Sequence, residues 1–353
     1  MQKITANQKS AFDPQCWKKL IRPRYLLSWF SLFLLALLAW IPNRIRDVIC
    51  IALSFPAVMV PTRPRRIAYA NLRTAFPDIK AKECRRIVRR MMAAGLAVFT
   101  AYAEPSVLPL WMLRRRWKVV GQEYLDQARS QGRAIIFIAP HSLAIDRCGL
   151  YLSYAGLHMC TMVHQQNNKV YDWFLNAQRL RFGGAVYERS SGLRTLIREL
   201  KAGHSCFFLP DQDLGRENSR FINFLGVPKA TVTTLPKLAK AGNAAVMQLF
   251  SVYNFKTACF EVHFSPVFDN YPTADLDADL ARMNQVIEDM VMLYKEQYMW
   301  FLRFFKTRPD DSYPNIYKNL HISSFKKGES LDYRGRRKPY QPPEDKASDS
   351  RSE

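Results

Sequence analysis

The spacing of apolar residues changes near residue 117 of this 353-residue chain. Before that point the apolar residues form long runs, and the charge-free run from Tyr25 to Asn43 contains nineteen residues. As a helix this run would span about 28 Å, close to the roughly 30 Å of a bilayer core. Trp29 and Trp40 would stand near its ends, as interfacial aromatic residues do, and Pro42 would end it. We therefore expect a membrane-anchoring helix over 25–43, with a very apolar core helix as the alternative.

A second charge-free stretch runs from Val48 to Thr62 and is interrupted by Pro56 and Pro61. It is too short to cross a bilayer comfortably, so an interfacial or re-entrant segment suits it better. A basic cluster follows at the position where such side chains meet anionic headgroups, although a solvated helix face would explain part of it. Its members are Arg63, Arg65, Arg66, Arg73, Lys80, Lys82, Arg85, Arg86, Arg89 and Arg90. We assign 1–24 to a basic polar N-terminus and 44–116 to a basic membrane-proximal helical region.

From residue 117 onward, short apolar runs rich in β-forming residues alternate with helical stretches, which is typical of an α/β domain. Strands are predicted at Ala134–Ala139, Met159–Val163, Ser205–Leu209, Ala244–Tyr253 and Ala258–Phe268. Helices are predicted at Ile145–Ala155, Val170–Arg181, Ser191–Ala202, Val232–Ala241 and Leu276–Tyr298. The α/β domain is expected over 117–318, and residues 319–353, which lack apolar periodicity, are expected to form a disordered basic tail.

The charge of the chain requires an anionic partner. The sequence has 52 Lys and Arg against 30 Asp and Glu, a formal net charge of +22, although 48% of its residues are hydrophobic. Residues 1–140 carry 24 of these basic residues against 7 acidic ones, so +17 of the excess lies there. Nucleic acid, an anionic membrane, phosphorylated substrates and an acidic protein all fit this total. Seven dispersed cysteines without a CxxC pair indicate free thiols in a reducing compartment.

The end of the first predicted strand carries the first candidate site. The segment AIIFIAPHSLAID places His141 directly after the strand and Asp146 five positions later. Five residues along one helix would turn the two side chains about 140° apart, so they can meet only if His141 lies on the turn and Asp146 on the first helical turn. Asp146 would then fix the imidazole tautomer, and the free nitrogen would act as a general base.

A second candidate site follows the strand that ends at Leu209. Asp211 and Asp213 emerge there with the same direction, and Arg179 and Arg181 precede a Gly-Gly pair. A paired-carboxylate or divalent-metal site is conceivable, but two acids alone make a poor metal site. The arginines could pair with these acids or with a substrate anion, and a purely structural ion pair is the alternative.

These segments together identify a family. HSLAID, RFGG, LPDQDLG, FLGVPKATVTTLPKLAK and EQYMWFLRFFKTRP resemble, in this order, the late (secondary) acyltransferases of lipid A biosynthesis. The resemblance covers residues 12–317, and FDPQCWKKLIRPRY and RRIAYANLRTAFPD look most like the myristoyl-transferring branch. The related glycerol-phosphate acyltransferases usually carry an Asn before the His and a Pro-Glu-Gly-Thr block, whereas Pro140 and residues 209–215 stand here.

The resemblance implies a glycerolipid acyltransferase-like α/β fold, in which helices flank a mixed sheet. It implies transfer of a myristoyl or lauroyl chain from acyl carrier protein to a hydroxyl of a 3-hydroxyacyl chain on a Kdo-lipid A precursor. His141 matches the general base and Asp146 its orienting carboxylate, while Arg181 and Asp213 match residues that complete the site; Asp211 and Arg179 stand beside them.

A thioester donor is already activated, so no cofactor and no metal is expected. The implied location is the bacterial inner membrane, with one N-terminal membrane segment and the catalytic domain facing the cytoplasm. Both substrates are anionic, and the basic clusters at 85–90 and 114–116 are candidate docking surfaces.

Three alternatives stay open at this stage. An acyltransferase of the same superfamily could act on another membrane glycolipid or phospholipid. A non-catalytic basic membrane protein would explain the charge and the anchor, but would leave HSLAID and PDQD without a purpose. A nucleic-acid-binding protein would explain the charge, yet the sequence has no RNP, zinc or helix-turn-helix signature, so nucleic acid is not expected as a partner.

Overall fold

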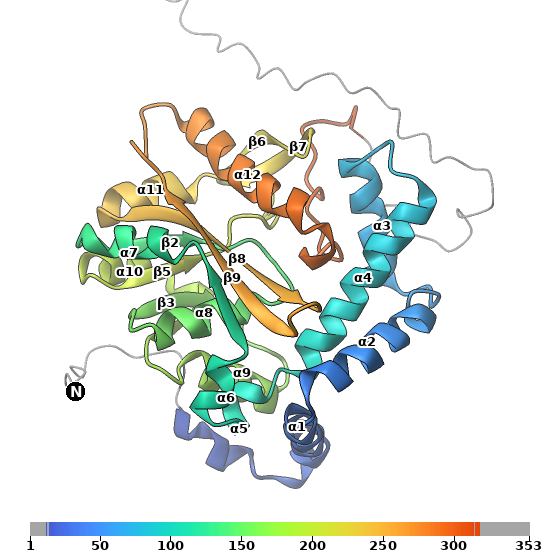
Figure 1. The fold of residues 1–353 in the computed structure, drawn as a ribbon. Helices are drawn as coiled ribbons and strands as arrows, with labels where there is room; N and C mark the ends of the chain where they lie inside the picture. Colours follow the sequence, from blue (N-terminus) through green and yellow to red (C-terminus); the bar gives the residue numbers. More distant parts are fainter. Residues whose placement is uncertain (1–11, 13, 314, 318–353) are drawn as a thin grey trace, which may run out of the picture.

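A seven-stranded sheet forms the centre of the computed structural model, which describes residues 12, 14–313 and 315–317 (Figure 1). The strand order is β1-β9-β8-β2-β5-β3-β4. All neighbouring strands are parallel except β8 and β9, which are antiparallel. The strands are β1 (Trp117–Val120), β2 (Ile135–Ile138), β3 (Met159–Val163), β4 (Ala185–Glu188), β5 (Ser205–Phe208), β8 (Ala245–Asn254) and β9 (Cys259–Val267). The predicted α/β fold with a mixed sheet is confirmed. The predicted tail over 319–353 and residues 1–11 lie outside the described residues.

Helices cover both faces of this sheet, which is why β2 is buried along its whole length. Ile135 and Phe137 pack against α7 (Gln122–Ser130) and α8 (Ile145–Tyr154). Ile136 and Ile138 share the opposite core with α10 (Leu193–Lys201), α11 (Thr234–Gly242) and α12 (Leu276–Leu293). The helix α9 (Lys169–Arg179) lies beside α8. Because β2, β5 and β3 are parallel neighbours, their carboxyl ends meet at one edge of the sheet.

A small second sheet was not predicted from the sequence. It consists of β6 (Ser219–Phe224) and β7 (Val227–Val232), which pair in antiparallel register, and α12 packs against β6. Every residue of β7 is buried, including Lys229. This sheet brings a charged side chain beneath the carboxyl edge of the main sheet.

The helix expected over 25–43 is shorter than predicted, and the chain turns after it. Short 3-10 helices at Pro14–Leu20 and Pro23–Tyr25 precede α1 (Leu26–Ala39), and α2 (Asn43–Ala57) follows. The two helical segments, Pro23–Ala39 and Asn43–Ala57, are bent by 119° relative to each other. In the described part of the chain, no single helix has both the length and the apolar character needed to cross a bilayer, although this bent pair has them jointly.

The region 44–116 is helical, and it packs on the α/β domain. It contains α3 (Arg63–Ala75), α4 (Ala81–Thr100), α5 (Glu104–Val107) and α6 (Leu110–Arg114). Leu72 and Val88 share one core cluster with Ile136 of β2 and Trp300. Glu104 is fully buried and pairs with Arg46, and α2 lies along α4. The first helices are therefore fixed against the edge of the sheet that carries the candidate site (Figure 1).

Candidate functional site

His141 lies on the loop that follows β2, at the carboxyl edge of the sheet. Its backbone is fixed from two sides, because its carbonyl accepts a hydrogen bond from the Met299 amide at 2.9 Å and its own amide donates to Asp211 Oδ2 at 2.7 Å. Its ring nitrogen Nδ1 lies 2.6 Å from Asp211 Oδ1. This contact leaves Nε2 as the nitrogen available to a substrate.

The structure gives Asp211, rather than Asp146, the contact with the His141 ring. Asp146 does lie on the first turn of α8, as predicted, but among the described residues no hydrogen bond joins it to His141. The physical reason is strand order: β5 is the neighbour of β2, so the residue that follows β5 reaches the turn that follows β2. The side-chain contact inferred from the five-residue spacing was therefore wrong, whereas the placement of both residues was right.

Asp211 is a buried, ionised carboxylate with three donors. Burial by itself raises its pKa, but the charge of His141 and the hydrogen bonds from the His141 side chain and amide outweigh this and lower the pKa of Asp211. The third donor is the Tyr298 hydroxyl, at 2.9 Å from Oδ2. Burial and the neighbouring Asp211 raise the pKa of Tyr298 well above its usual value, so this hydroxyl stays a donor. The His141 imidazole is thus held in one tautomer and one orientation by Asp211. We call this pair the His141–Asp211 dyad.

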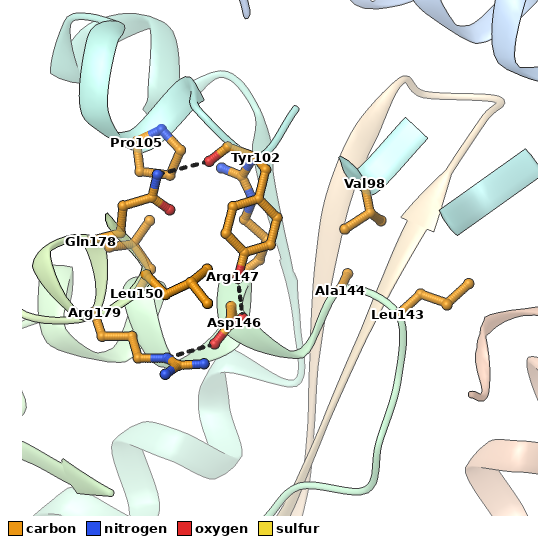
Figure 2. Close-up of a pocket in the computed structure, with 11 residues that line it drawn as sticks. Val98, Tyr102, Pro105, Leu143, Ala144, Asp146, Arg147, Leu150, Gln178 and Arg179 are labelled. Carbon is orange, nitrogen blue, oxygen red and sulfur yellow. Dashed lines mark hydrogen bonds and ion pairs between the residues drawn. The ribbon is translucent and has the colours of Figure 1, made fainter. Parts of the chain in front are cut away.

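Asp146 belongs to a second polar cluster, which Figure 2 shows with Tyr102 and Arg179. Arg179 Nε donates to Asp146 Oδ1 at 2.9 Å, and the Tyr102 hydroxyl donates to Oδ2. Burial raises the pKa of Asp146, but the Arg179 charge and the two hydrogen bonds outweigh it and lower this pKa. The cluster holds one guanidinium near the loop that carries His141.

One cavity connects the two clusters. Its volume is ≈ 260 Å³, and His141, Asp146 and Arg179 line it together. The remaining wall comes from α8, the end of α9 and the strands β3 to β5. Its apolar part is formed by Ile145, Gly149, Met159, Met162, Val163, Leu180, Ala185, Val186, Phe207 and Leu209, and Ser153, Thr161, His164 and Gln166 add polar groups. The free Nε2 of His141 therefore stands at one side of a cavity whose walls are mostly apolar.

The other predicted site residues lie elsewhere. Arg181 is exposed, lies over the Phe182 ring and donates to the Leu108 carbonyl at 3.5 Å. Asp146 lines the cavity described above and also the smaller pocket drawn in Figure 2, and Arg181 lines neither of them. Asp213 accepts hydrogen bonds from the amide and the hydroxyl of Thr307 at 2.5 and 2.7 Å. It anchors the C-terminal segment, two residues beyond the carboxylate that touches His141.

Sequence reasoning missed Lys229, which lies beneath these carboxylates. Lys229 is 0% exposed, and its Nζ has no hydrogen-bond partner among the described residues. Burial lowers the pKa of Lys229 to about 8, although the charges of Asp211 and Asp213 oppose that shift. A lysine in the middle of the apolar run LGVPKATV was the only sequence signal, and it could equally mark an exposed strand position.

The two aspartates do not form the metal site considered from sequence. In the described residues, the cluster with suitable ligand atoms is His158, Glu199 and His204, whose atoms lie within 4.8 Å of one another. It stands at the amino ends of β3 and β5, away from His141. Glu199 already accepts from Tyr187 and faces His204 Nδ1, both at 2.8 Å, and the two imidazoles stack with centroids 3.8 Å apart. This hydrogen-bonded cluster lies apart from the site at His141.

Comparisons with known proteins show one family over most of the chain. The family model described as bacterial lipid A biosynthesis acyltransferase matches residues 14–307. A lipid A biosynthesis acyltransferase of Haemophilus influenzae is 32% identical over 82% of this chain and 91% of its own. The lipid A biosynthesis myristoyltransferase of Escherichia coli is 32% identical over 90% of this chain and 98% of its own. The lauroyltransferase of the same organism is 27% identical over 84% and 97%.

The match spans the first helices, the His141 loop and the segment that carries Tyr298 and Thr307, so it includes every part of the site described above. The resemblance inferred from the motifs is confirmed over most of the chain. The chain therefore belongs to the bacterial lipid A biosynthesis acyltransferase family.

Proposed function

We propose that this protein transfers a fatty acyl chain, myristoyl or lauroyl, from acyl carrier protein to a hydroxyl group of a 3-hydroxyacyl chain on a Kdo-lipid A precursor. The observation that carries the proposal is the His141–Asp211 dyad, which stands at the edge of a largely apolar cavity. A secondary alcohol is a poor nucleophile and needs a general base within hydrogen-bond reach. A thioester is an activated donor, so the reaction requires no cofactor.

The chemical step uses His141 first as a base and then as an acid. Nε2 takes the proton of the acceptor hydroxyl while its oxygen forms a bond to the thioester carbonyl carbon. The imidazolium that results is stabilised by the carboxylate of Asp211 at 2.6 Å. When the tetrahedral intermediate collapses, the carbon–sulfur bond breaks, and the leaving thiolate takes the proton from Nε2. An ester and a free thiol are the products.

The oxyanion of this intermediate requires a donor on the cavity wall. Arg179 fits this role because its guanidinium lines the cavity with His141 and is held by Asp146 at 2.9 Å. In this assignment Asp146 acts on the reaction through Arg179. The site-completing role that the resemblance implies for Arg181 is assigned here to Arg179, and Asp213 supports the loop through its bonds to Thr307.

The donor's acyl chain would occupy the apolar part of the cavity. Gly149, Ser153 and Met159 line it together with side chains of β3 to β5. Because a 12- or 14-carbon chain must be buried while the thioester stands at His141, the apolar walls are expected to set which chain is preferred.

The bent pair α1–α2 is the proposed membrane contact. Many large apolar side chains are exposed on these two consecutive helices and just after them: Leu26, Leu27, Phe30, Phe33, Leu34, Leu37, Trp40, Ile45, Val48, Ile49, Ile51, Leu53, Phe55, Met59 and Val60. Such a concentration of exposed apolar side chains is typical of a protein that binds a membrane. We place it on the cytoplasmic face of the inner membrane, where acyl carrier protein and the lipid acceptor meet. Its basic flanks attract anionic lipid.

The test is a transfer assay with purified protein, acyl carrier protein thioester and Kdo-lipid A precursor, read by mass spectrometry of the lipid. The His141→Ala variant should lose transfer by at least about a hundredfold, the contribution typical of a general base. His158→Ala is the matched control, because His158 is an exposed histidine at the opposite edge of the sheet. Near wild-type transfer by His141→Ala would refute the proposed mechanism.

A further inference from the structure

A second, larger cavity lies on the other side of the loop after β2 that carries His141. We call this loop the catalytic loop. Its volume is ≈ 550 Å³, and its walls come from α2, α4, the tip of the β8–β9 hairpin and the segment after α12. Arg89 and Arg90 line it from α4, Lys256 from the hairpin tip and Ile51 from α2. The mechanism above uses none of these four residues.

This cavity concentrates positive charge that the protein does not neutralise. Among the described residues, Arg89, Arg90 and Lys256 form no ion pair, while Glu296 is the one acidic residue that lines the cavity. Arg89 is positioned rather than loose, since its guanidinium stacks over Phe55 at 4.2 Å. Three cations against one carboxylate favour an anionic ligand.

The hairpin that carries Lys256 is held against the first helices. Arg44 donates to the Phe255 carbonyl at 3.0 Å and to the Lys256 carbonyl at 2.7 Å. Asn43 also donates to the Ala258 carbonyl at 2.7 Å. The cationic wall is therefore assembled from segments that are far apart in the sequence, with fixed spacing between them.

The same cavity shares a wall with the catalytic loop. Gln297 lines it, and the Gln297 carbonyl accepts from the Leu143 amide at 2.8 Å, while the Met299 amide donates to the His141 carbonyl at 2.9 Å. The opposite wall includes Ile51, which belongs to the exposed apolar surface of α2. A lipid bound here would have its headgroup beside the catalytic loop and its chains beside the apolar surface.

We propose that this cavity binds the anionic, phosphorylated sugar headgroup of the lipid acceptor, with Arg89, Arg90 and Lys256 contacting its phosphate groups. Arginine forms paired hydrogen bonds to phosphate oxygens, and lysine acts as a point charge. This inference rests on the proposed function, because it assigns the acceptor subsite of the same reaction. The donor would then use the cavity that His141 and Arg179 line, and the two substrates would approach His141 from opposite sides.

The test compares acceptor and donor kinetics in full-length variants. Arg89→Gln/Arg90→Gln should raise KM for the acceptor by about tenfold or more, the loss expected for charge-assisted phosphate contacts in a solvated cavity. KM for the acyl donor should stay within about twofold. Lys256→Gln should act in the same direction from a different element, which guards against a folding defect in α4.

The matched control neutralises two other arginines of the same helix, Arg85 and Arg86. Both are exposed, and neither lines the cavity. If Arg85→Gln/Arg86→Gln raises acceptor KM as much as Arg89→Gln/Arg90→Gln does, the effect is general attraction to an anionic surface and the subsite is refuted. An acceptor from which the phosphates have been removed should be used equally by wild type and by Arg89→Gln/Arg90→Gln, and a persisting difference would also refute it.

Failure of this inference is distinguishable from failure of the proposed function. A wild-type protein that transfers no acyl chain would contradict the proposed function itself. A wild-type protein that does transfer, combined with unchanged acceptor KM in the variants of Arg89, Arg90 and Lys256, would contradict only the headgroup site.

Discussion

Replacing Asp211 by asparagine, which has nearly the same shape, should strongly lower the rate of acyl transfer. The carboxylate lies 2.6 Å from His141 Nδ1 and is 1% exposed, so its charge acts on the imidazole with little screening by water. The variant keeps the shape of the side chain, but it removes the charge and offers His141 an amide of uncertain orientation in place of two equivalent oxygens. The imidazolium formed during transfer then lacks its counter-charge.

The size of the loss follows from electrostatics. Two unit charges about 4 Å apart attract each other by about 4 kcal/mol at an effective dielectric constant of about 20. Since each 1.36 kcal/mol of barrier corresponds to a factor of ten, kcat of Asp211→Asn should fall by about a thousandfold. KM for the acyl donor should change little, because Asp211 does not line the cavity.

Initial rates of acyl transfer at saturating substrate measure this effect, and thermal unfolding checks that the variant is folded. Asp213→Asn is the matched control: it makes the same substitution two residues further on, at a carboxylate that binds Thr307 rather than His141. Asp213→Asn should lower the thermal unfolding temperature, but its kcat should stay closer to that of wild type than the kcat of Asp211→Asn does. If Asp211→Asn keeps kcat within about tenfold of wild type, or if Asp213→Asn loses more activity than Asp211→Asn does, the assignment of Asp211 as the partner of His141 is refuted.

Three further predictions concern backbone, buried charge and membrane contact. Both glycines of RFGG have φ of 101°, but a Cβ at Gly184 would also meet a carbonyl oxygen of β3 whereas one at Gly183 meets open space. Urea unfolding should therefore show a loss of about 1–2 kcal/mol for Gly183→Ala and clearly more for Gly184→Ala. Burial lowers the pKa of Lys229 from 10.5 to about 8. Between these two pH values Lys229 is therefore protonated in the unfolded chain and neutral in the folded protein. Between about pH 7 and pH 10.5 the unfolding free energy of wild type should thus rise relative to Lys229→Met by about 3 kcal/mol, and a constant difference would contradict this. Phe30→Glu, on the exposed surface of α1, should weaken binding to anionic vesicles in flotation assays, whereas Val120→Glu, an exposed apolar position on β1, should not.

The sequence predicted the α/β core well because its strands are short apolar runs with clear ends. The run AIIFIA was predicted as a strand over Ala134–Ala139, and the structure has β2 at Ile135–Ile138. The residue after such a strand lies at the carboxyl edge of the sheet, so the position of His141 followed from the pattern alone. The small sheet of β6 and β7 was missed because its turn and its buried lysine weaken the strand signal.

The partner of His141 could not be read from the sequence, because it depends on strand order. A residue five positions away, such as Asp146, is the natural candidate when only local spacing is known. Asp211 is 70 positions away and becomes a neighbour only because β5 pairs with β2. Strand order is fixed by the packing of whole helices, which no short motif encodes.

The end of the helix expected over 25–43 could not be read from the sequence for a related reason. Apolar length between Tyr25 and Asn43 fits a spanning helix, but helix ends depend on tertiary contacts as well as on hydropathy. Arg46 follows the apolar run and donates to the Leu38 carbonyl at 3.2 Å, and it pairs with the buried Glu104. These contacts draw the chain back onto the α/β domain after Ala39 and produce the 119° bend.

Lys229 shows how the buried charges depend on one another. An isolated buried ammonium would be strongly destabilising, yet here it faces Asp211 and Asp213, each of which binds a different segment of the chain. Asp211 fixes the His141 loop and Tyr298, and Asp213 fixes Thr307, so one lysine lies between the catalytic loop and the C-terminal segment. Because the Lys229 charge interacts with both carboxylates, removing it should disturb the C-terminal segment and the catalytic loop together. A buried charge of this kind costs stability, and the dyad it supports gives a physical reason for its presence.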